Sequence, residues 1–173
     1  MAQLYAAELP EGATPAKPPL WQGLGKLDMA ISTSSDEARA YFIQGMLIAN
    51  DFNHSEAVRS FRWAQHLDPD CAMCFWGEAL VLGPNINAPM EAASAPRAYA
   101  AVSKAVELSD RASSKERALI EALAARYGPD GMARRAELDE AYAVAMEKVA
   151  RAYPEDDDLQ ALAAEAMMDA QPW

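Results

Sequence analysis

The chain has 173 residues, of which 51% are hydrophobic and 24% are charged, so it is long enough and apolar enough for about one globular domain. These proportions exclude a collagen-like chain, a disordered chain and a disulfide scaffold. Twenty-six acidic residues outnumber 15 basic ones, and the net charge of −11 repels nucleic-acid phosphates and anionic membrane surfaces. No stretch approaches the ~18 uncharged apolar residues of a membrane-spanning helix. We therefore expect neither nucleic acid nor a membrane as a partner.

Residues 1–34 hold most of the early Pro and Gly and show no helical period. We expect them to form an extended leader that a few apolar side chains hold against the rest of the chain. The first ten residues lack the basic start and the long apolar run of an intact secretory signal, so the compartment stays open between cytoplasm and periplasm. The side chains expected to hold the leader are Leu20, Trp21, Leu24, Leu27 and Ile31.

The rest of the chain is dominated by the helix formers Ala, Glu, Leu, Met and Arg, and no alternating apolar and polar run suggests a strand. The sequence therefore predicts an all-α domain over residues 35–173. Asn53 with Glu56 and Ser113 with Glu116 are typical of capping boxes, and Pro96 suits a first helical turn. The predicted helices span about 34–50, 53–67, 71–82, 94–109, 113–127, 132–152 and 154–169.

Small and large side chains follow one another at fixed offsets in the first helix pair, residues 38–71. Small residues let two helices approach closely, and large ones fill the gap beside them. This order resembles the 34-residue unit of the tetratricopeptide repeat (TPR) family. The resemblance implies a right-handed α-α superhelix of about three helix pairs over residues 38–154, in which the match weakens from the first pair to the third. The residues that carry it in the first pair are Tyr41, Gly45, Ile48, Ala57, Phe61, Ala64 and Pro69.

The last predicted helix has no partner in that scheme, yet it carries an apolar stripe at helical spacing. A stack of repeats must cover its open end, so we interpret this helix as a C-terminal cap. The alternative is that it forms the first half of a fourth repeat in a longer protein. The stripe consists of Leu159, Leu162, Ala163, Ala166 and Met167.

A narrower resemblance covers residues 52–87, which read FNHSEAVRSFRWAQHLDPDCAMCFWGEALVLGPNIN. This segment is similar to a bacterial group of TPR-repeat proteins that is uncharacterised, without a settled biochemical role. Some members of the group carry histidines just before the IST segment. This chain has residues 26–29, KLDM, at that place, so it lacks those metal ligands.

Cys71 and Cys74 are the only cysteines, and they stand three residues apart at an expected helix start, where the helix dipole favours thiolate. Such a pair suits capture of copper or zinc, or redox exchange, but a closed metal site needs about four ligands. Only His54 and His66 can add imidazole, and ~100° per helical residue places them ~120° apart around the axis. We expect two small buried residues at a helix contact, a turn role for His54 and a solvated His66. Metal binding through Cys71, Cys74 and His54 is the alternative.

The sequence contains no nucleophile elbow, phosphate-binding loop or metalloprotease helix. Its many carboxylates are typical of solvated helix faces, and the acidic run at 156–158 is favoured by its place at a helix start. We therefore expect a protein that is not an enzyme and that has no cofactor.

The TPR resemblance implies that the first helix of each pair lines a concave groove. This row is rich in Met and aromatic residues, and exposed apolar side chains typically mark a partner site. We expect the groove to bind a peptide or a segment of a partner protein, with the loop 83–90 as one lip. The alternatives are that Trp21 and Leu24 fill the groove, or that the chain is a fragment of a larger TPR protein and self-associates as a homo-oligomer. The expected groove residues are Arg39, Phe42, Met46 and Ala49, then Met73, Trp76 and Leu80, and in the third pair Glu116, Leu119, Leu123 and Arg126.

Overall fold

The computed structural model describes residues 14–130 and 132–171. Within these ranges the chain forms seven α-helices and no strand, which confirms the all-α class. Residues 1–13 of the expected leader and residues 172–173 of the expected helical domain lie outside the described residues. The helices are α1 (Asp36–Asn50), α2 (His54–Leu67), α3 (Ala72–Leu82), α4 (Ala95–Leu108), α5 (Ser114–Ala124), α6 (Arg135–Ala152) and α7 (Asp157–Asp169), with short 3₁₀ turns at η1 (Ala92–Ser94) and η2 (Ser109–Arg111).

Most helix starts follow from local capping chemistry. Ser113 and Glu116 form the complete capping box that their spacing predicts at the start of α5. At the start of α2 only half of the predicted box is formed, because the Asn53 side chain accepts from the Glu56 backbone N–H while the Glu56 carboxylate accepts from Arg59. Helix α5 ends three residues before the predicted position, since its last turn tightens into bonds that span three residues instead of four.

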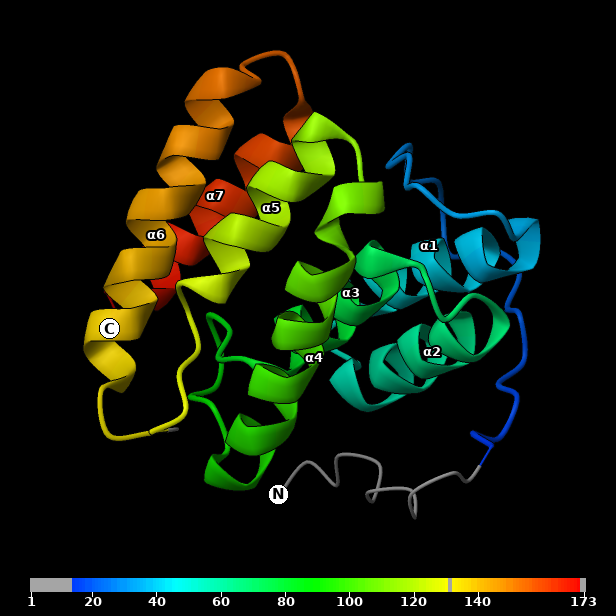
Figure 1. Cartoon of the computed structure of the whole chain (residues 1–173), viewed down its shortest axis with the longest axis horizontal. Coiled ribbons are helices and arrows are strands. Elements are labelled where there is room, and N and C mark those ends of the chain that lie inside the picture. Colours follow the sequence, from blue (N-terminus) through cyan, green and yellow to red (C-terminus); the bar gives the residue numbers. More distant parts are fainter. Residues whose placement is uncertain (1–13, 131, 172–173) are drawn as a thin grey trace.

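The helices are stacked in series along the chain (Figure 1). Each helix from α1 to α7 contacts the next one, and α3 contacts both α1 and α5. Helices α1, α3 and α5 therefore form one inner row, and α2, α4 and α6 each pack beside a member of that row. Helix α7 follows α6 and packs against it.

Phe61 fixes the first of these helix contacts. Its ring lies between Gly45 of α1 and Gly77 of α3, and a Cβ at Gly45 would lie 2.7 Å from the ring atom Cζ. A Cβ at Gly77 would clash with the same ring even more severely. The small residues therefore let one aromatic ring join α1, α2 and α3, as the predicted close approach of small and large residues requires.

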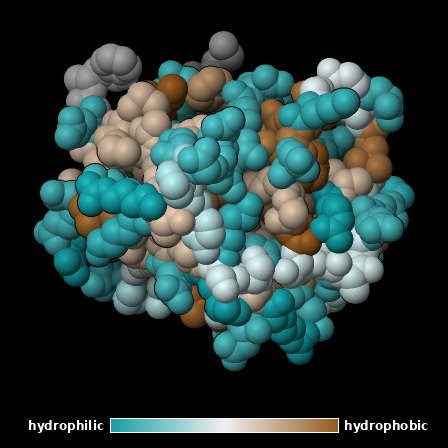
Figure 2. Space-filling view, turned by 90° about the horizontal axis from the view of Figure 1, so that it is seen from above, coloured by the Kyte–Doolittle hydropathy of each residue, from teal (hydrophilic) through white to brown (hydrophobic). Residues whose placement is uncertain are grey.

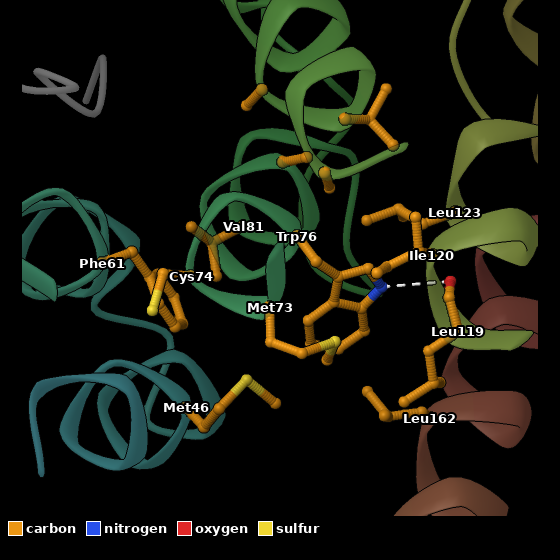
Figure 3. Packing of buried hydrophobic residues seen from close by; sticks show 14 of the residues in the cluster. Met46, Phe61, Met73, Cys74, Trp76, Val81, Leu119, Ile120, Leu123 and Leu162 are labelled. Atoms are coloured by element: carbon orange, nitrogen blue, oxygen red, sulfur yellow. Dashed lines mark hydrogen bonds between the residues drawn. The ribbon is translucent and has the colours of Figure 1, made fainter. Parts of the chain in front are cut away.

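Trp76 occupies the centre of the core, where α3, α5 and α7 meet (Figure 3). Its side chain is fully buried, and its indole Nε1 donates a hydrogen bond to the Leu119 carbonyl oxygen at 3.1 Å. Figure 3 shows Met73 beside the ring and Leu162 of α7 close to Leu119. A buried indole needs such a polar partner, so this hydrogen bond fixes the distance between α3 and α5.

Helix α7 buries most of the apolar stripe that the sequence predicts for it. Leu159, Leu162, Ala163 and Ala166 of the predicted apolar stripe are buried. Met167 is 44% exposed and departs from the prediction. Its exposure leaves an apolar side chain on the outer side of α7.

The described part of the leader packs across α1 and reaches α5. Ile31 is buried as predicted, Leu24 and Leu27 are partly buried, but Leu20 and Trp21 are 43% and 41% exposed. Hydrogen bonds hold much of the leader in place instead. Its backbone N–H and C=O groups have no partners in a helix or sheet of their own, and side chains of the helices satisfy them. Examples are Tyr41 Oη donating to Pro18 O at 2.8 Å, Trp21 N donating to Gln44 at 2.8 Å, and Ser32 donating to Glu116.

Hydrophilic residues cover most of the face seen in Figure 2, and apolar residues lie there in separate patches. Among the described helices, none combines the length and apolar character needed to cross a lipid bilayer.

Candidate functional site

The predicted groove residues lie mainly in the interior. Phe42, Met73 and Trp76 have no exposed surface, and Met46 is 4% exposed. The expectation that these four side chains line an open groove is wrong, because the same core also takes in apolar residues of the leader and of α7. Other members of this core are Met29 and Ile31 of the leader and Leu159 and Leu162 of α7.

Three groove residues keep some exposure. Arg39 donates to the carbonyl oxygens of Ile31 at 2.6 Å and of Thr33 at 3.2 Å, so it holds the leader and does not face an open groove. Ala49 and Leu80 are partly buried and line a small cavity beside α7, described below. Trp21, the other predicted occupant of the groove, stays largely exposed.

The candidates of the third pair, Glu116, Leu119, Leu123 and Arg126, are all buried. Glu116 joins the leader to α5, because its carboxylate accepts from Ser32 N and Oγ at 2.5 Å and from Ser113 N at 2.7 Å. Burial alone would raise the pKa of Glu116, but these hydrogen bonds outweigh it and hold the pKa below its usual value.

Cys71 and Cys74 form a disulfide and are fully buried. Cys71 is the N-cap of α3, and its sulfur accepts from the Cys74 backbone N–H at 3.2 Å. The predicted burial at a helix contact is confirmed, whereas the disulfide was not predicted. In this state neither sulfur is a thiolate ligand, and the described residues contain no group of three or more His, Cys, Asp or Glu placed to hold a metal ion.

The two histidines lie in different surroundings. His54 is buried, with Nδ1 3.2 Å from the Val81 carbonyl oxygen, which matches the predicted backbone contact. Burial lowers the pKa of His54, and the contact with Val81 opposes this only in part, so the ring is neutral near pH 7. His66 is exposed, as predicted, and its ring packs against Trp63.

A hollow that we call the outer cleft lies between residues 84–90 and the helices α6 and α7. Its volume is about 1080 Å³. Ile86 and Met90 line it from the loop, and Val144, Met167 and Met168 line it from the helices. Loop 83–90 was predicted to form a lip of the groove along α1, α3 and α5, but its residues 84–90 line this cleft with α6 and α7 instead.

A smaller hollow, which we call the inner cavity, lies where α1 and α3 approach α7. Its volume is about 190 Å³, well above the ~30 Å³ that one water molecule occupies. Met46, Leu80 and Leu162 supply apolar walls, while Glu165 and Asp169 of α7 supply carboxylates. The inner cavity shares several lining residues with the outer cleft, Asp169 among them.

Arg126 lines the inner cavity and binds residues that line the outer cleft. Its Nη2 donates to Asp169 Oδ2 at 2.5 Å and to Pro84 O at 3.1 Å, and its Nε donates to Asp139 Oδ1 at 3.1 Å. The guanidinium carbon also lies 4.6 Å from the centre of the Tyr142 ring. Because Arg126 stays charged and its side chain is 2% exposed, these partners are needed to hold its charge inside the protein.

Arg135 completes this buried charge cluster. It donates to Asp139 Oδ2 at 2.9 Å and also to the Arg126 carbonyl oxygen. Its guanidinium lies 5.7 Å from the centre of the Tyr127 ring, and Tyr127 Oη donates to Ala79 O at 2.6 Å. The cluster therefore joins the ends of α3, α5, α6 and α7.

Burial disfavours the charged form of both α7 carboxylates that line the inner cavity. Burial raises the pKa of Glu165, and the charge of Asp169 adds to this while Arg126 opposes it. Burial also raises the pKa of Asp169 against the opposing pull of Arg126. Asp169 Oδ1 is buried without a hydrogen-bond partner among the described residues.

Comparison with protein families, curated proteins and solved structures finds no match for this chain. The candidate site is therefore defined by the contacts within this chain.

Sequence reasoning missed most of this site. It placed Arg126 on a concave row but predicted no role for Asp139, Glu165 or Asp169, which read as ordinary solvated helix carboxylates. One usable signal was Glu165 with Asp169, four residues apart on one helix, which places both carboxylates on one face. No sequence signal indicated that this face turns inward.

Proposed function

We propose that this protein is a non-enzymatic protein-interaction module, built from TPR-like helix pairs, that binds a segment of a partner protein in the outer cleft. The serial stacking of helix pairs supports the TPR-like interpretation, as does the close approach of Gly45, Phe61 and Gly77. We therefore place the proposed partner-binding site in the outer cleft beside α6 and α7, because the inner row of α1, α3 and α5 is buried.

The observation that carries this proposal is the gathering of exposed apolar side chains in one hollow. Val144, Met167 and Met168 are 48%, 44% and 49% exposed, and all three line the outer cleft. Apolar side chains that cluster in a hollow favour binding more than single exposed residues do. Methionine adapts to varied partner shapes because its side chain is flexible and polarizable.

The charge of the outer cleft indicates which chemistry a partner segment needs. Four carboxylates line it, and Glu140 is the one among them without an ion pair to a described residue. The others are already paired, Asp139 and Asp169 with Arg126 and Glu147 with Arg151. The whole chain also carries a net charge of −11. Complementarity therefore favours a partner segment that combines apolar side chains with Lys or Arg.

A phage-displayed peptide library tests this proposal. We expect selection on the purified protein to enrich peptides with apolar residues and at least one basic residue. Synthetic versions of these peptides should bind the native protein and lose binding to the double variant Val144→Lys, Met167→Lys, because the new ammonium groups replace apolar contacts and repel the basic residue of the ligand. Val106→Lys is the matched control, since Val106 is 44% exposed on α4 outside the cleft.

Two results would overturn the proposal. The first is selection without any enriched sequence class. The second is enriched peptides that bind the double variant as tightly as the native protein. If light scattering shows a concentration-dependent dimer that the double variant abolishes, the cleft binds a second copy of the chain instead of a foreign segment.

A further inference from the structure

The inner cavity differs from the outer cleft in its balance of charge. One cation, Arg126, lines it together with two carboxylates, Glu165 and Asp169. Asp139, which also binds Arg126, is compensated separately by Arg135. Two guanidiniums thus face three carboxylates, which leaves an excess of one negative charge at the end of α7.

Asp169 shows where that charge is least satisfied. Its side chain is 1% exposed, its Oδ2 accepts from Arg126, and its Oδ1 has no hydrogen-bond partner among the described residues. A buried carboxylate oxygen without a donor is costly, so proteins rarely leave one in that state. Asp169 is one of the residues that line the inner cavity. A donor from outside the chain that reached this oxygen would complete its hydrogen bonding.

Glu165 lies one helical turn before Asp169 and lines the same cavity. Among the described residues it takes part in no ion pair, although the charges of Asp169 and Arg126 act on it. A donor group that enters beside Asp169 Oδ1 thus meets a second acceptor one turn away. The remaining walls near it are apolar and include Met46, Leu80 and Leu162.

We propose that the inner cavity binds an alkylammonium group, with Asp169 Oδ1 and the Glu165 carboxylate as acceptors and with the apolar walls in contact with the methylene chain. An ammonium group brings three N–H donors and one positive charge, which match the unpartnered oxygen and the excess charge. The apolar walls suit the methylene stem of such a ligand.

Other ligand classes fit this cavity less well. A hard metal ion needs several oxygen ligands around one point, and the described residues contain no cluster of three or more His, Cys, Asp or Glu. An anion is repelled by the two carboxylates. A neutral ligand does not compensate the excess negative charge. The ammonium group has two sources, a free small amine or a lysine side chain of a partner segment.

Isothermal titration calorimetry at pH 8 tests the proposal with n-butylammonium chloride as the probe and n-butanol as its neutral match. We expect saturable binding of n-butylammonium and none of n-butanol. In Glu165→Gln, binding should weaken about tenfold or more, the scale of one charge-assisted hydrogen bond. Glu121→Gln is the matched control, because Glu121 is exposed on α5, lines neither hollow, and its loss should leave binding unchanged.

A second variant probes the apolar wall without touching a carboxylate. Ala49 is partly buried and lines the cavity, so Ala49→Met should fill space that the methylene chain needs and weaken n-butylammonium binding. Nα-acetyl-lysine N-methylamide separates the two sources. If it binds as well as n-butylammonium, a lysine side chain fits the site, and if only n-butylammonium binds, the ligand is a free amine.

The proposal is overturned if n-butylammonium shows no saturable binding to the native protein. It is also overturned if Glu165→Gln, shown by circular dichroism to be folded, binds the probe as tightly as the native protein. This inference goes beyond the proposed function and does not depend on it, because the Val144 and Met167 variants change residues that line the outer cleft and not the inner cavity.

Discussion

Two pairs of buried or partly buried carboxylates lie in opposite surroundings. One pair, Asp68 and Glu116, binds the leader, and we call it the leader contact. The other pair, Glu165 and Asp169, lines the inner cavity. Asp68 and Glu116 accept hydrogen bonds from leader hydroxyl and backbone N–H groups, and these bonds overcome the effect of burial and lower their pKa values. Burial raises the pKa of Glu165 and of Asp169, and Arg126 offsets this only in part. The first region is complete within the chain, and the second is short of one donor and one positive charge.

This contrast distinguishes two kinds of buried carboxylate in one small protein, those that stabilise the fold and those that we propose bind a ligand. A buried carboxylate with all its donors holds two segments together, as Glu116 does for the leader and α5. A buried carboxylate with an unpartnered oxygen weakens the fold unless something binds there. We therefore interpret the leader contact as structure and the inner cavity as a binding site.

The largest expected effect comes from removing the cation that supports the cavity. Arg126→Met should lower the free energy of unfolding by about 3–5 kcal/mol, because Asp139 and Asp169 lose a buried partner. Urea denaturation measures this loss. Arg134→Met is the control, since Arg134 is exposed and should change stability by less than ~0.5 kcal/mol. A loss below ~1 kcal/mol for Arg126→Met would show that the cluster does not hold the helix ends together.

Glu116→Gln should have the next largest effect. We expect a loss of about 1.5–3 kcal/mol at pH 7, since the hydrogen bonds from Ser32 and Ser113 lose their charged acceptor. The folded pKa of Glu116 lies below its unfolded value, so its contribution is present above the unfolded pKa and is lost as the pH falls through the folded pKa. Denaturation of both proteins from pH 3 to pH 8 should show the difference shrinking in acid. A constant difference across that range contradicts the role of the charge.

Glu165→Gln should have the smallest effect and the opposite pH dependence. The folded pKa of Glu165 is raised, so its favourable contribution is present below the unfolded pKa of ~4.3 and is lost as the pH rises through the folded pKa. The glutamine variant lacks this loss and should be as stable as the native protein or more stable at pH 8, within ~1 kcal/mol, while the two proteins converge in acid. If Glu165→Gln is instead much less stable at pH 8, the Glu165 charge supports the fold and the contrast between the two regions fails.

The sequence was informative where the structure depends on neighbours in the chain. The Ser113 capping box was predictable because it depends on two residues three apart. The contact between Gly45 and Phe61 was predictable because consecutive helices place them together. The apolar stripe of α7 was predictable from its spacing, apart from Met167.

The sequence was not informative where the structure depends on segments that fold back from a distance. Phe42, Met46 and Trp76 were expected to be accessible, but the leader and α7 bury them together with the rest of the core. Asp169 meets Arg126 across 43 positions of sequence, and no local pattern reports such a pair. The bond between Cys71 and Cys74 was possible from their spacing, yet the spacing alone did not distinguish it from a pair of buried thiols.

The most direct test of the contrast is an NMR titration that follows the side-chain carboxyl carbons of Glu116 and Glu165 with and without n-butylammonium. We predict that the pKa of Glu116 lies below its usual value and does not change with the probe. The pKa of Glu165 should lie above its usual value and fall when the probe binds, because a bound cation favours the charged carboxylate. A Glu165 pKa that is not raised, or that is unaffected by saturating n-butylammonium, would contradict the assignment of the inner cavity as a cation site.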